Sequence, residues 1–338
     1  MVMREEAAGE RTQLPVPSSD WLFSRFRGNP IITAADLPYR ANTVFNPAAA
    51  QVDGTTVLLI RVEDMRGISH LAVARSHDGR TDWKFDAAPT FESDPENHPE
   101  EIWGVEDPRV TWLPEVSEWA VAYTAYSRRG PLVSLAFTRD FRSFTRLGPA
   151  MPPEDKDAAL FPRRFGGRWA LIHRPSQLRG PSHMWLSYSP DLLHWGDHTL
   201  LLPAREGAWW DAGKIGLGPP PLETPDGWLV MYHGVHLTAS GSLYRLGFAL
   251  LDLEDPKVCL RRSDEWVFGP SEPYERVGDV VGVTFPCGWI LDPDTDELRL
   301  YYGAADSSIA LATARLSEVL DYVRSCPKPD RRRHADRP

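Results

Sequence analysis

The 338-residue sequence lacks most features that assign a protein to a class at first sight. Its three cysteines, Cys259, Cys287 and Cys326, lie far apart and form no Cys-x-x-Cys pair, which excludes a disulfide framework and a thiolate metal site. No apolar run is long enough to cross a bilayer, and residues 1–20 carry mixed charges without the apolar stretch of a secretory signal. We therefore expect a cytoplasmic protein without a membrane partner.

Basic charge and nucleotide-binding motifs are scarce as well. The formal net charge is −10, and basic residues gather only in the tail DRRRHADRP, whereas nucleic-acid binding needs many Lys and Arg side chains to neutralise phosphates. We expect the tail to be a solvated, disordered end. The sequence contains no Gly-x-Ser-x-Gly, no P-loop and no Gly-x-Gly-x-x-Gly after a strand, which argues against serine hydrolysis and nucleotide-driven chemistry.

Helical patterns are also rare, whereas aromatic residues and prolines are plentiful. The chain has 13 Trp, 10 Tyr and 31 Pro, a composition that favours strands, turns and a carbohydrate-friendly surface. Helical spacing is limited to residues 19–26, with Ser19 as the expected N-cap, and to residues 316–326. The remaining apolar segments are short and separated by Gly, Pro and Asp, so they predict strands.

An internal repeat organises these strands. Four segments read as a strand that ends in a polar turn with Asp: HLAVARSHDGRTDWKF, VSLAFTRDFRSFTRL, MWLSYSPDLLHWGDH and YRLGFALLDLEDP; IALATARL is a fifth copy without the turn. Their spacing of roughly 50 to 65 residues fits one four-stranded propeller blade per repeat. We predict an all-β, five-bladed β-propeller over residues 30–315. An N-terminal extension with the short helix (1–29) precedes it, and a C-terminal helix with the tail (316–338) follows. A β-sandwich is the alternative.

Two neighbouring acids, Glu106 and Asp107, begin a predicted strand in the segment GVEDPRV. Because successive side chains of a strand point to opposite faces, we expect only one of the two acids to face a pocket. Pro108 biases Asp107 toward an extended backbone, and Arg109 is placed to share its face. A surface turn with an ion pair is the alternative interpretation.

Cationic side chains recur further along the chain. Arg163 begins one predicted strand and Arg174 ends the next, after a Gly-Gly hairpin turn, so we expect both to reach one ligand. Lys214 lies in a Gly- and Pro-rich loop, His233 follows a buried strand, and Tyr244 precedes the next strand. Together these groups suit a dianion such as phosphate, since Arg clamps it bidentately and Lys adds a point charge.

The segment HGVH raises the question of a metal site. His233 and His236 face opposite ways if they lie in a strand, and no carboxylate or third His flanks them. We therefore expect no metal. The polar residues that interrupt apolar strands are candidates for a central funnel instead: Asn46, Arg61, Asp107, Arg163, Arg174, Lys214, His233 and Asp306.

Several motifs, in their order and spacing, resemble glycoside hydrolase family 130, the β-mannoside phosphorylases. The resemblance runs from about residue 30 to 325 and rests on FNPAAA, GVEDPRV, FPRRFGGRWALIHRPS, AGKIGLGPPPLETPDGWLVMYHGV, YRLGFALLDLEDP and YYGAADSSIALA. The family has a five-bladed propeller, which the repeat count suggests independently.

The resemblance implies a role for each site residue. Asp107 would be the catalytic acid, protonating the glycosidic oxygen through the O3 hydroxyl of the mannosyl unit. The phosphate-binding set would be Arg163, Arg174, Lys214, His233 and Tyr244. The residues that hold the mannosyl unit would be Asn46, Arg61 and Asp306. Glu106 replaces the Tyr of many members, so its part in the sugar site is open.

The expected reaction is inverting phosphorolysis of a β-D-mannoside to α-D-mannose 1-phosphate. An anionic nucleophile needs cations rather than the second carboxylate that an inverting hydrolase requires. Phosphate would be the co-substrate, and no cofactor is expected. The alternatives are β-mannoside hydrolysis, phosphorolysis of β-1,2 rather than β-1,4 linkages, and a non-catalytic carbohydrate-binding propeller. The acceptor (glucose, N-acetylglucosamine, mannose or a longer mannan chain), the preferred chain length and the assembly, a homo-oligomer included, stay open.

Overall fold

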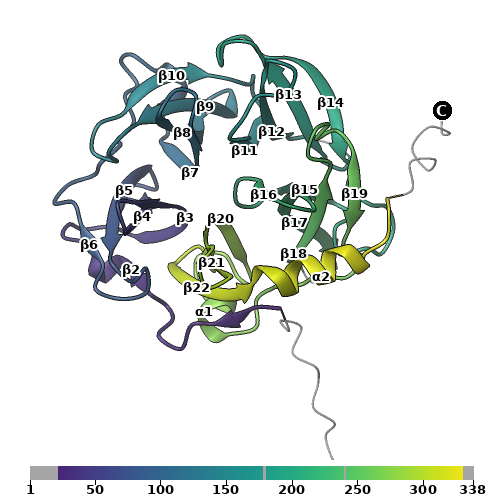
Figure 1. The fold of residues 1–338 in the computed structure, drawn as a ribbon. Coiled ribbons are helices and arrows are strands. Elements are labelled where there is room, and N and C mark those ends of the chain that lie inside the picture. Colours follow the sequence, from purple (N-terminus) through teal and green to yellow (C-terminus); the bar gives the residue numbers. More distant parts are fainter. Residues whose placement is uncertain (1–21, 178–179, 240, 330–338) are drawn as a thin grey trace, which may run out of the picture.

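The computed structural model describes residues 22–177, 180–239 and 241–329, which form five antiparallel sheets around a central axis (Figure 1). The first blade consists of β3 (Thr43–Val52), β4 (Thr55–Glu63), β5 (Ser69–Ser76) and β6 (Lys84–Phe85). The second consists of β7 (Val105–Leu113), β8 (Glu118–Ser127), β9 (Gly130–Thr138) and β10 (Thr145–Pro149). The third consists of β11 (Asp155–Leu160), β12 (Trp169–Pro175), β13 (Met184–Ser189) and β14 (Gly196–Leu202).

The last two blades have additional short strands. The fourth consists of β15 (Lys214–Leu217), β16 (Leu222–Thr224), β17 (Gly227–Thr238), β18 (Gly241–Leu251) and β19 (Cys259–Arg262). The fifth contains β20 (Thr284–Asp292), β21 (Glu297–Ala304) and β22 (Ser308–Arg315). The strands nearest the axis are β3, β7, β11, β15 and β20 (Figure 1). The predicted five-bladed β-propeller is therefore confirmed.

The N-terminal segment closes the ring. β1 (Ser24–Arg25) and β2 (Ile32–Thr33) both pair with β22, so the last blade combines residues from both ends of the chain. This pairing corrects the helix predicted over residues 19–26, of which residues 19–21 lie outside the described residues. Leu22 and Phe23 are buried between the last two blades, and this burial and the edge pairing outweigh the helical spacing. The propeller sheet thus begins before residue 30.

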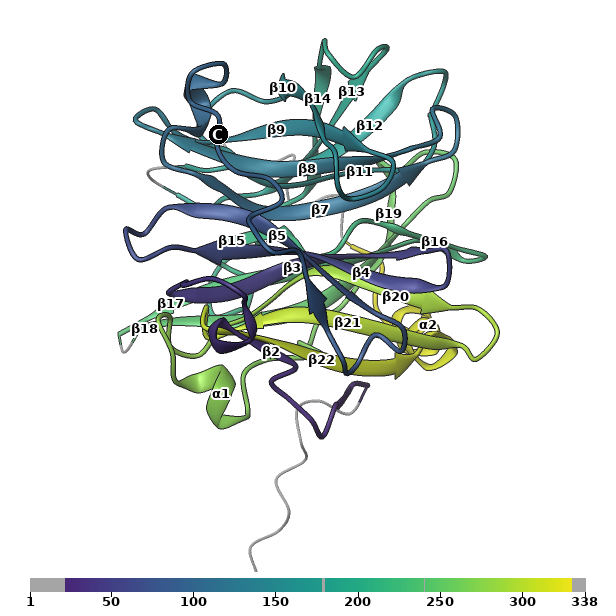
Figure 2. The same cartoon turned by 90° about the vertical axis from the view of Figure 1, so that its left-hand side faces the viewer.

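Few helices accompany the strands. The described residues form two single-turn 3₁₀ helices, η1 (Ala34–Asp36) and η2 (Pro99–Glu101), and two α-helices, α1 (Pro273–Arg276) and α2 (Leu316–Ser325). The helix α2 confirms the predicted terminal helix and buries Leu316, Val319, Leu320 and Val323. Figure 2 shows α1 and α2 at opposite ends of the fifth blade. Within the described residues, no helix has the length and apolar character needed to span a membrane. The basic tail, residues 330–338, lies outside the described residues.

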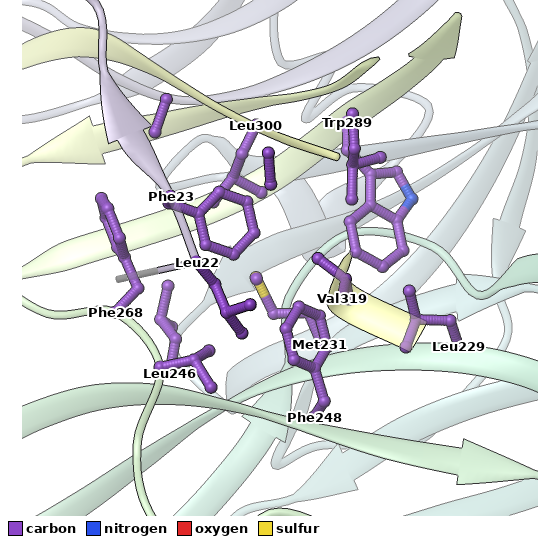
Figure 3. Close-up of a cluster of buried hydrophobic side chains, with 14 of the residues drawn as sticks. Leu22, Phe23, Leu229, Met231, Leu246, Phe248, Phe268, Trp289, Leu300 and Val319 are labelled. Atoms are coloured by element: carbon purple, nitrogen blue, oxygen red, sulfur yellow. The ribbon is translucent and has the colours of Figure 1, made fainter. Parts of the chain in front are cut away.

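An apolar layer fills the space between each pair of neighbouring blades. Figure 3 shows the layer between the fourth and fifth blades. Met231 and Phe248 of the fourth blade pack there with Trp289 and Leu300 of the fifth blade and with Val319 of α2. Because the central strands of a blade are covered on both faces, they form short continuous apolar runs in the sequence. The ring is thus held by packing between blades, and the polar groups are concentrated at strand ends.

The Asp of the repeat holds the turn after the third strand of four blades. Each of these carboxylates accepts backbone N–H bonds from the residues two and three positions later, and the four are Asp78, Asp140, Asp191 and Asp252. Such bonds are the usual reason for Asp in a turn. The fifth copy is β22, after which α2 begins in place of the turn. The repeat therefore marks equivalent positions in the five blades.

Candidate active site

Four of the five innermost strands carry a β-bulge near their start. The register shifts between Phe45 and Ala48, Glu106 and Arg109, Lys156 and Ala159, and Pro286 and Gly288. In three of these bulges a residue has a positive φ: 47° at Asn46, 47° at Asp107 and 55° at Asp157. Asn and Asp tolerate this left-handed conformation better than other non-glycine residues, and a bulge re-aims a side chain. The bulges allow polar side chains of different blades to meet.

Asp107 is buried and contacts both neighbouring blades. Its Oδ1 accepts hydrogen bonds from Asn46 Nδ2 at 2.8 Å and from an Arg61 Nη at 2.9 Å, and its Oδ2 lies 3.7 Å from Lys156 Nζ. Burial alone would raise the pKa of this carboxyl, but Arg61, Lys156 and Asn46 outweigh burial and hold the pKa at about 2. Asp107 is therefore ionised at neutral pH in the free protein.

Glu106 contacts the same guanidinium, because its Oε1 lies 3.0 Å from the other Nη of Arg61. This contact corrects the expectation that only one of the two acids faces the site. The alternation of side chains along a strand fails at a bulge, and the bulge lies between Glu106 and Arg109. Arg61 is oriented further by the hydrogen bond from its Nε to Ser69 Oγ at 2.9 Å. One arginine thus joins both acids.

Asp157 lies at the equivalent bulge of the third blade. Its Oδ2 accepts a hydrogen bond from Arg174 Nε at 2.8 Å and lies 3.6 Å from His233 Nε2. Its Oδ1 lies 3.6 Å from an Arg109 Nη. Burial alone would raise the pKa of Asp157, but the surrounding cations Arg174, Lys156 and Arg109 outweigh burial and hold this pKa well below its usual range. This carboxylate stays ionised and orients the cations around it.

Arg109 connects three innermost strands. It belongs to β7, and its Nε and one Nη donate to the carbonyls of Gly218, just after β15, and of Leu217, the last residue of β15, both at 2.7 Å. The same side chain approaches Asp157 on β11. Arg109 is 1% exposed, so its charge is held entirely by protein groups. We therefore assign Arg109 to the framework beneath the site.

His233 is a buried, neutral imidazole beside these cations. Burial lowers the pKa of His233 to about 3, and the nearby Asp157 offsets this effect only in part. Its Nδ1 is buried and has no hydrogen-bond partner among the described residues. The ring packs against Phe285, with ring centroids 4.8 Å apart. A neutral imidazole with an open nitrogen can exchange a hydrogen bond with a ligand.

Lys214 and Tyr244 lie next to His233. Lys214 Nζ is 5.6 Å from the centre of the Tyr244 ring, and the Tyr244 and His233 rings have centroids 6.1 Å apart. Both side chains are half-buried. In the part of the chain that the structure describes, Lys214 forms no ion pair with a carboxylate. The structure therefore brings Arg174, Lys214, His233 and Tyr244 together, with one cation uncompensated.

Arg163 does not join this group, which corrects the expectation that Arg163 and Arg174 reach one ligand from adjacent strands. The strand that pairs with β12 ends at Leu160, and the cross-strand partner of Arg174 is Lys156. Arg163 lies in the turn at the other end of this hairpin, where it donates to the Leu253 carbonyl and contacts Glu223 and Glu254. Lys156 takes the place that the sequence pattern suggested for Arg163.

Asp306 is half-buried in the turn between β21 and β22, with a φ of 50°. Burial, together with the negative charge of Asp107, raises the pKa of Asp306 to about 6, although Arg61 and Lys156 oppose the rise. Asp306 therefore lies in the same electrostatic environment as Asp107, Arg61 and Lys156. Within the described residues, no group of three or more His, Cys, Asp or Glu is placed to hold a metal ion.

Sequence reasoning missed Lys156 and Asp157. The signal that could have revealed them is the bulge motif, since Asn46-Pro47 in β3 and Asp107-Pro108 in β7 have a counterpart in Asp157-Ala158 of β11, which Lys156 directly precedes. The counterpart lacks the proline, and the repeat was recognised in the third strands rather than in the first. Comparing the first strands of the blades would have placed both residues at the axis.

The chain is similar to known proteins over most of its length. Residues 16–325 match the family model of glycoside hydrolase family 130, described as beta-1,4-mannooligosaccharide phosphorylase. A beta-1,4-mannooligosaccharide phosphorylase of Ruminococcus albus is 35% identical over 310 residues, covering 89% of this chain and 90% of that protein.

Two solved structures place the similarity in three dimensions. The β-1,2-mannobiose phosphorylase of Listeria innocua, in complex with β-1,2-mannobiose, superposes with a TM-score of 0.80 at 30% identity, covering 89% of this chain and 99% of that one. A structure reported with family 130 glycoside hydrolases that target β-1,2-mannosidic linkages in Candida mannan has a TM-score of 0.76 at 27% identity, covering 91% and 96% of the two chains. The present chain belongs to glycoside hydrolase family 130.

Proposed function

We propose that this protein cleaves β-D-mannosides with inorganic phosphate and inverts the anomeric configuration, giving α-D-mannose 1-phosphate and a shortened sugar. The observation that carries this proposal is the cluster of Arg174, Lys214, His233 and Tyr244, which lies beside the ionised Asp107 pocket and contains an uncompensated ammonium. A protein that only binds carbohydrate has no need of such a cluster. The relatives named as mannoside phosphorylases support the same reaction.

The cluster suits a phosphate dianion. Within the described residues, the Nη groups of Arg174 donate one hydrogen bond, to Ser176 Oγ, and so stay open to a ligand, while its Nε is fixed by Asp157. Lys214 adds a point charge, and Tyr244 and the open Nδ1 of His233 add neutral hydrogen bonds. Because these groups are prearranged at the axis, they can hold phosphate in line with the anomeric carbon. Phosphate is then co-substrate, and no cofactor is needed.

Asp107 would supply the proton for the leaving oxygen. Its pKa of about 2 in the free protein is too low for a general acid, which works best with a pKa near the working pH. Bound phosphate adds negative charge near Lys156 and Arg174, and a bound sugar excludes water, and both changes raise the pKa of a carboxyl. We therefore expect Asp107 to take up its proton in the complex with both substrates.

The bond changes balance with these groups alone. A phosphate oxygen forms a bond to the anomeric carbon on one face of the mannosyl ring while the glycosidic C–O bond breaks on the other. The proton of Asp107 reaches the leaving oxygen through the O3 hydroxyl of the mannosyl unit, as the family resemblance implies. Asn46, Arg61 and Asp306 would hold the mannosyl unit, and Glu106 would bind a hydroxyl near the scissile bond.

Hydrolysis is the second candidate, because a similar structure is reported with hydrolases of this family. An inverting hydrolase needs a second carboxylate as base to activate water. Asp157 is the buried carboxylate next to the cation cluster, but Arg174 contacts it and its pKa lies well below the usual range, so it is a weak base. These surroundings favour phosphorolysis.

The decisive experiment incubates the purified protein with β-1,4-mannobiose and with β-1,2-mannobiose, with and without phosphate. Phosphorolysis predicts sugar phosphate in the presence of phosphate and almost no cleavage without it. Unchanged release of free mannose when phosphate is omitted would identify a hydrolase. The same assay decides the linkage, for which relatives of both kinds exist.

A further inference from the structure

An aromatic pair projects beside the start of β7, where the proposed reaction assigns no role. Trp103 and Tyr126 are 41% and 37% exposed. Their rings meet edge to face with centroids 5.3 Å apart, and the Trp103 backbone N–H donates to the Tyr126 carbonyl at 2.9 Å. Two large aromatic rings held together in solvent expose an apolar ring face beside polar N–H and O–H edges, which is the kind of surface that binds amphipathic ligands.

The loop that carries Trp103 is anchored from below. Glu101 is fully buried, and its carboxylate accepts hydrogen bonds from Tyr123 Oη at 2.6 Å and Arg146 Nε at 2.9 Å. It also accepts the backbone N–H of Asp94 at 2.9 Å, so both ends of the segment 94–101 are fixed. A buried carboxylate that is fully paired in this way makes its surroundings rigid. The aromatic pair is therefore prearranged, which lowers the entropic cost of binding.

Trp103 lies a few residues before Asp107, so the pair is close to the site but does not adjoin it. Trp103 precedes Asp107 by four positions, a path of about 13 Å along an extended backbone. Gly104 connects the two by passing close to Ser69, the residue that orients Arg61. Trp103 is thus too far away to contact the mannosyl unit that reacts, but close enough to contact a later unit of the same chain.

We infer that Trp103 and Tyr126 form a stacking platform for a sugar unit of the leaving group, beyond the unit that adjoins Asp107. The C–H faces of a pyranose ring are apolar and pack on aromatic rings, while the Trp and Tyr polar edges can bond its hydroxyls. This inference rests on the proposed function, because the proposed reaction decides which end of the oligosaccharide extends from Asp107 toward the aromatic pair. It predicts that the protein prefers oligosaccharides to disaccharides.

The same two strands provide a matched control. Trp112 and Trp119 form a second aromatic pair, with centroids 5.4 Å apart, at the opposite ends of β7 and β8. Trp112 is 39% exposed, close to the value for Trp103, but lies near the end of β7, whereas Trp103 precedes the start of this strand. Trp112→Ala therefore removes a similar ring from the same sheet without touching the platform.

The test compares kcat/KM for mannobiose and mannotetraose, in the linkage that the protein cleaves, among the unaltered protein, Trp103→Ala, Tyr126→Phe and Trp112→Ala. We expect Trp103→Ala to lower kcat/KM about fivefold to tenfold for the tetraose and less than twofold for the biose. Trp112→Ala should alter neither value. An equal loss on both substrates, or no loss on the tetraose, would overturn the inference.

Two further readouts separate this inference from its alternatives. If the protein makes no sugar phosphate, the proposed function fails, and the platform is tested by calorimetric titration with mannotetraose. A selective loss of tetraose affinity in Trp103→Ala supports the platform there too, and unchanged affinity overturns it. Sedimentation of Trp103→Ala addresses the other occupant, a second copy of the chain: a change of oligomeric state with unchanged substrate preference would make the pair a subunit interface instead.

Discussion

Asp107 and Asp157 occupy equivalent bulges in neighbouring blades, yet their surroundings differ. Asp107 is held on one oxygen by Asn46 and Arg61, and among the described residues the cation nearest its second oxygen is Lys156, with Nζ at 3.7 Å. Asp157 is fully buried and contacts Arg174, His233 and Arg109, the last of which is tied to backbone carbonyls next to β15. We propose that the same backbone device presents one carboxylate to a substrate and uses the other to organise cations.

The largest effect should come from Asp107→Asn. Loss of the acid should lower the rate of phosphorolysis about a thousandfold or more, because the amide cannot deliver a proton to the leaving oxygen. The fold should persist, since Arg61 keeps Glu106 as a partner. Turnover measured with calorimetric phosphate binding checks both points. Retained turnover would move the acid to another residue, with Glu106 the first to test.

Asp157→Asn should lower the stability of the protein more than Asp107→Asn does. Removing this charge leaves Arg174 and Arg109 buried without their counter-ion, which should cost about 3 kcal/mol of unfolding free energy. Urea unfolding of Asp157→Asn beside Asp107→Asn measures the difference. If Asp157→Asn proved as stable as the unaltered protein, the organising role assigned to Asp157 would be lost.

Lys214→Ala should weaken phosphate binding specifically. We expect the KM for phosphate to rise about tenfold to a hundredfold, because one charge-assisted contact is removed, while the KM for the mannoside changes little. Arg163→Ala is the matched control, since Arg163 contacts Glu223 and Glu254 instead of the cluster. A rise in the phosphate KM for Arg163→Ala equal to that for Lys214→Ala would contradict the geometry.

The smallest effect concerns the pH dependence of stability. The pKa of Asp306 is raised to about 6 by burial and by Asp107, so the folded state holds the proton of the Asp306 carboxyl more tightly than the unfolded chain does. The contribution of protonated Asp306 to the free energy of unfolding is complete below about pH 4, the pKa in the unfolded chain, and is lost as the pH rises through 6. Asp306→Asn should therefore raise Tm by about 2 °C relative to the unaltered protein at pH 8 and less at pH 4.5. Equal shifts at both pH values in thermal melts would contradict this assignment.

Much of the fold follows from the sequence, because the repeat depends on local chemistry. An Asp that accepts two backbone amides in each turn marks the third strand of four blades, and spacing then predicts the blade count. The terminal helix was predictable from its apolar spacing. The segment at residues 22–25 was not, because its structure depends on pairing with β22, a strand almost 300 residues away.

The site was predictable only in part. Asn46, Arg61 and Asp107 meet as expected, and Arg174, Lys214, His233 and Tyr244 gather beside them. Arg163 was misplaced because the boundaries of β11 decide which residue pairs with Arg174, and boundaries are the weakest part of a sequence-based assignment. Glu106 was misjudged because a bulge reverses the alternation rule, and the bulge becomes visible only in the pairing register.

In the proposed reaction, phosphate directed by the cation cluster attacks the anomeric carbon with Asp107 as the acid. The most direct test of this reaction is ³¹P and ¹H NMR of the first product formed from mannobiose in phosphate buffer. We predict α-D-mannose 1-phosphate in equimolar amount with released mannose. The β anomer of the phosphate, or two molecules of free mannose per mannobiose without any sugar phosphate, would contradict the proposed reaction.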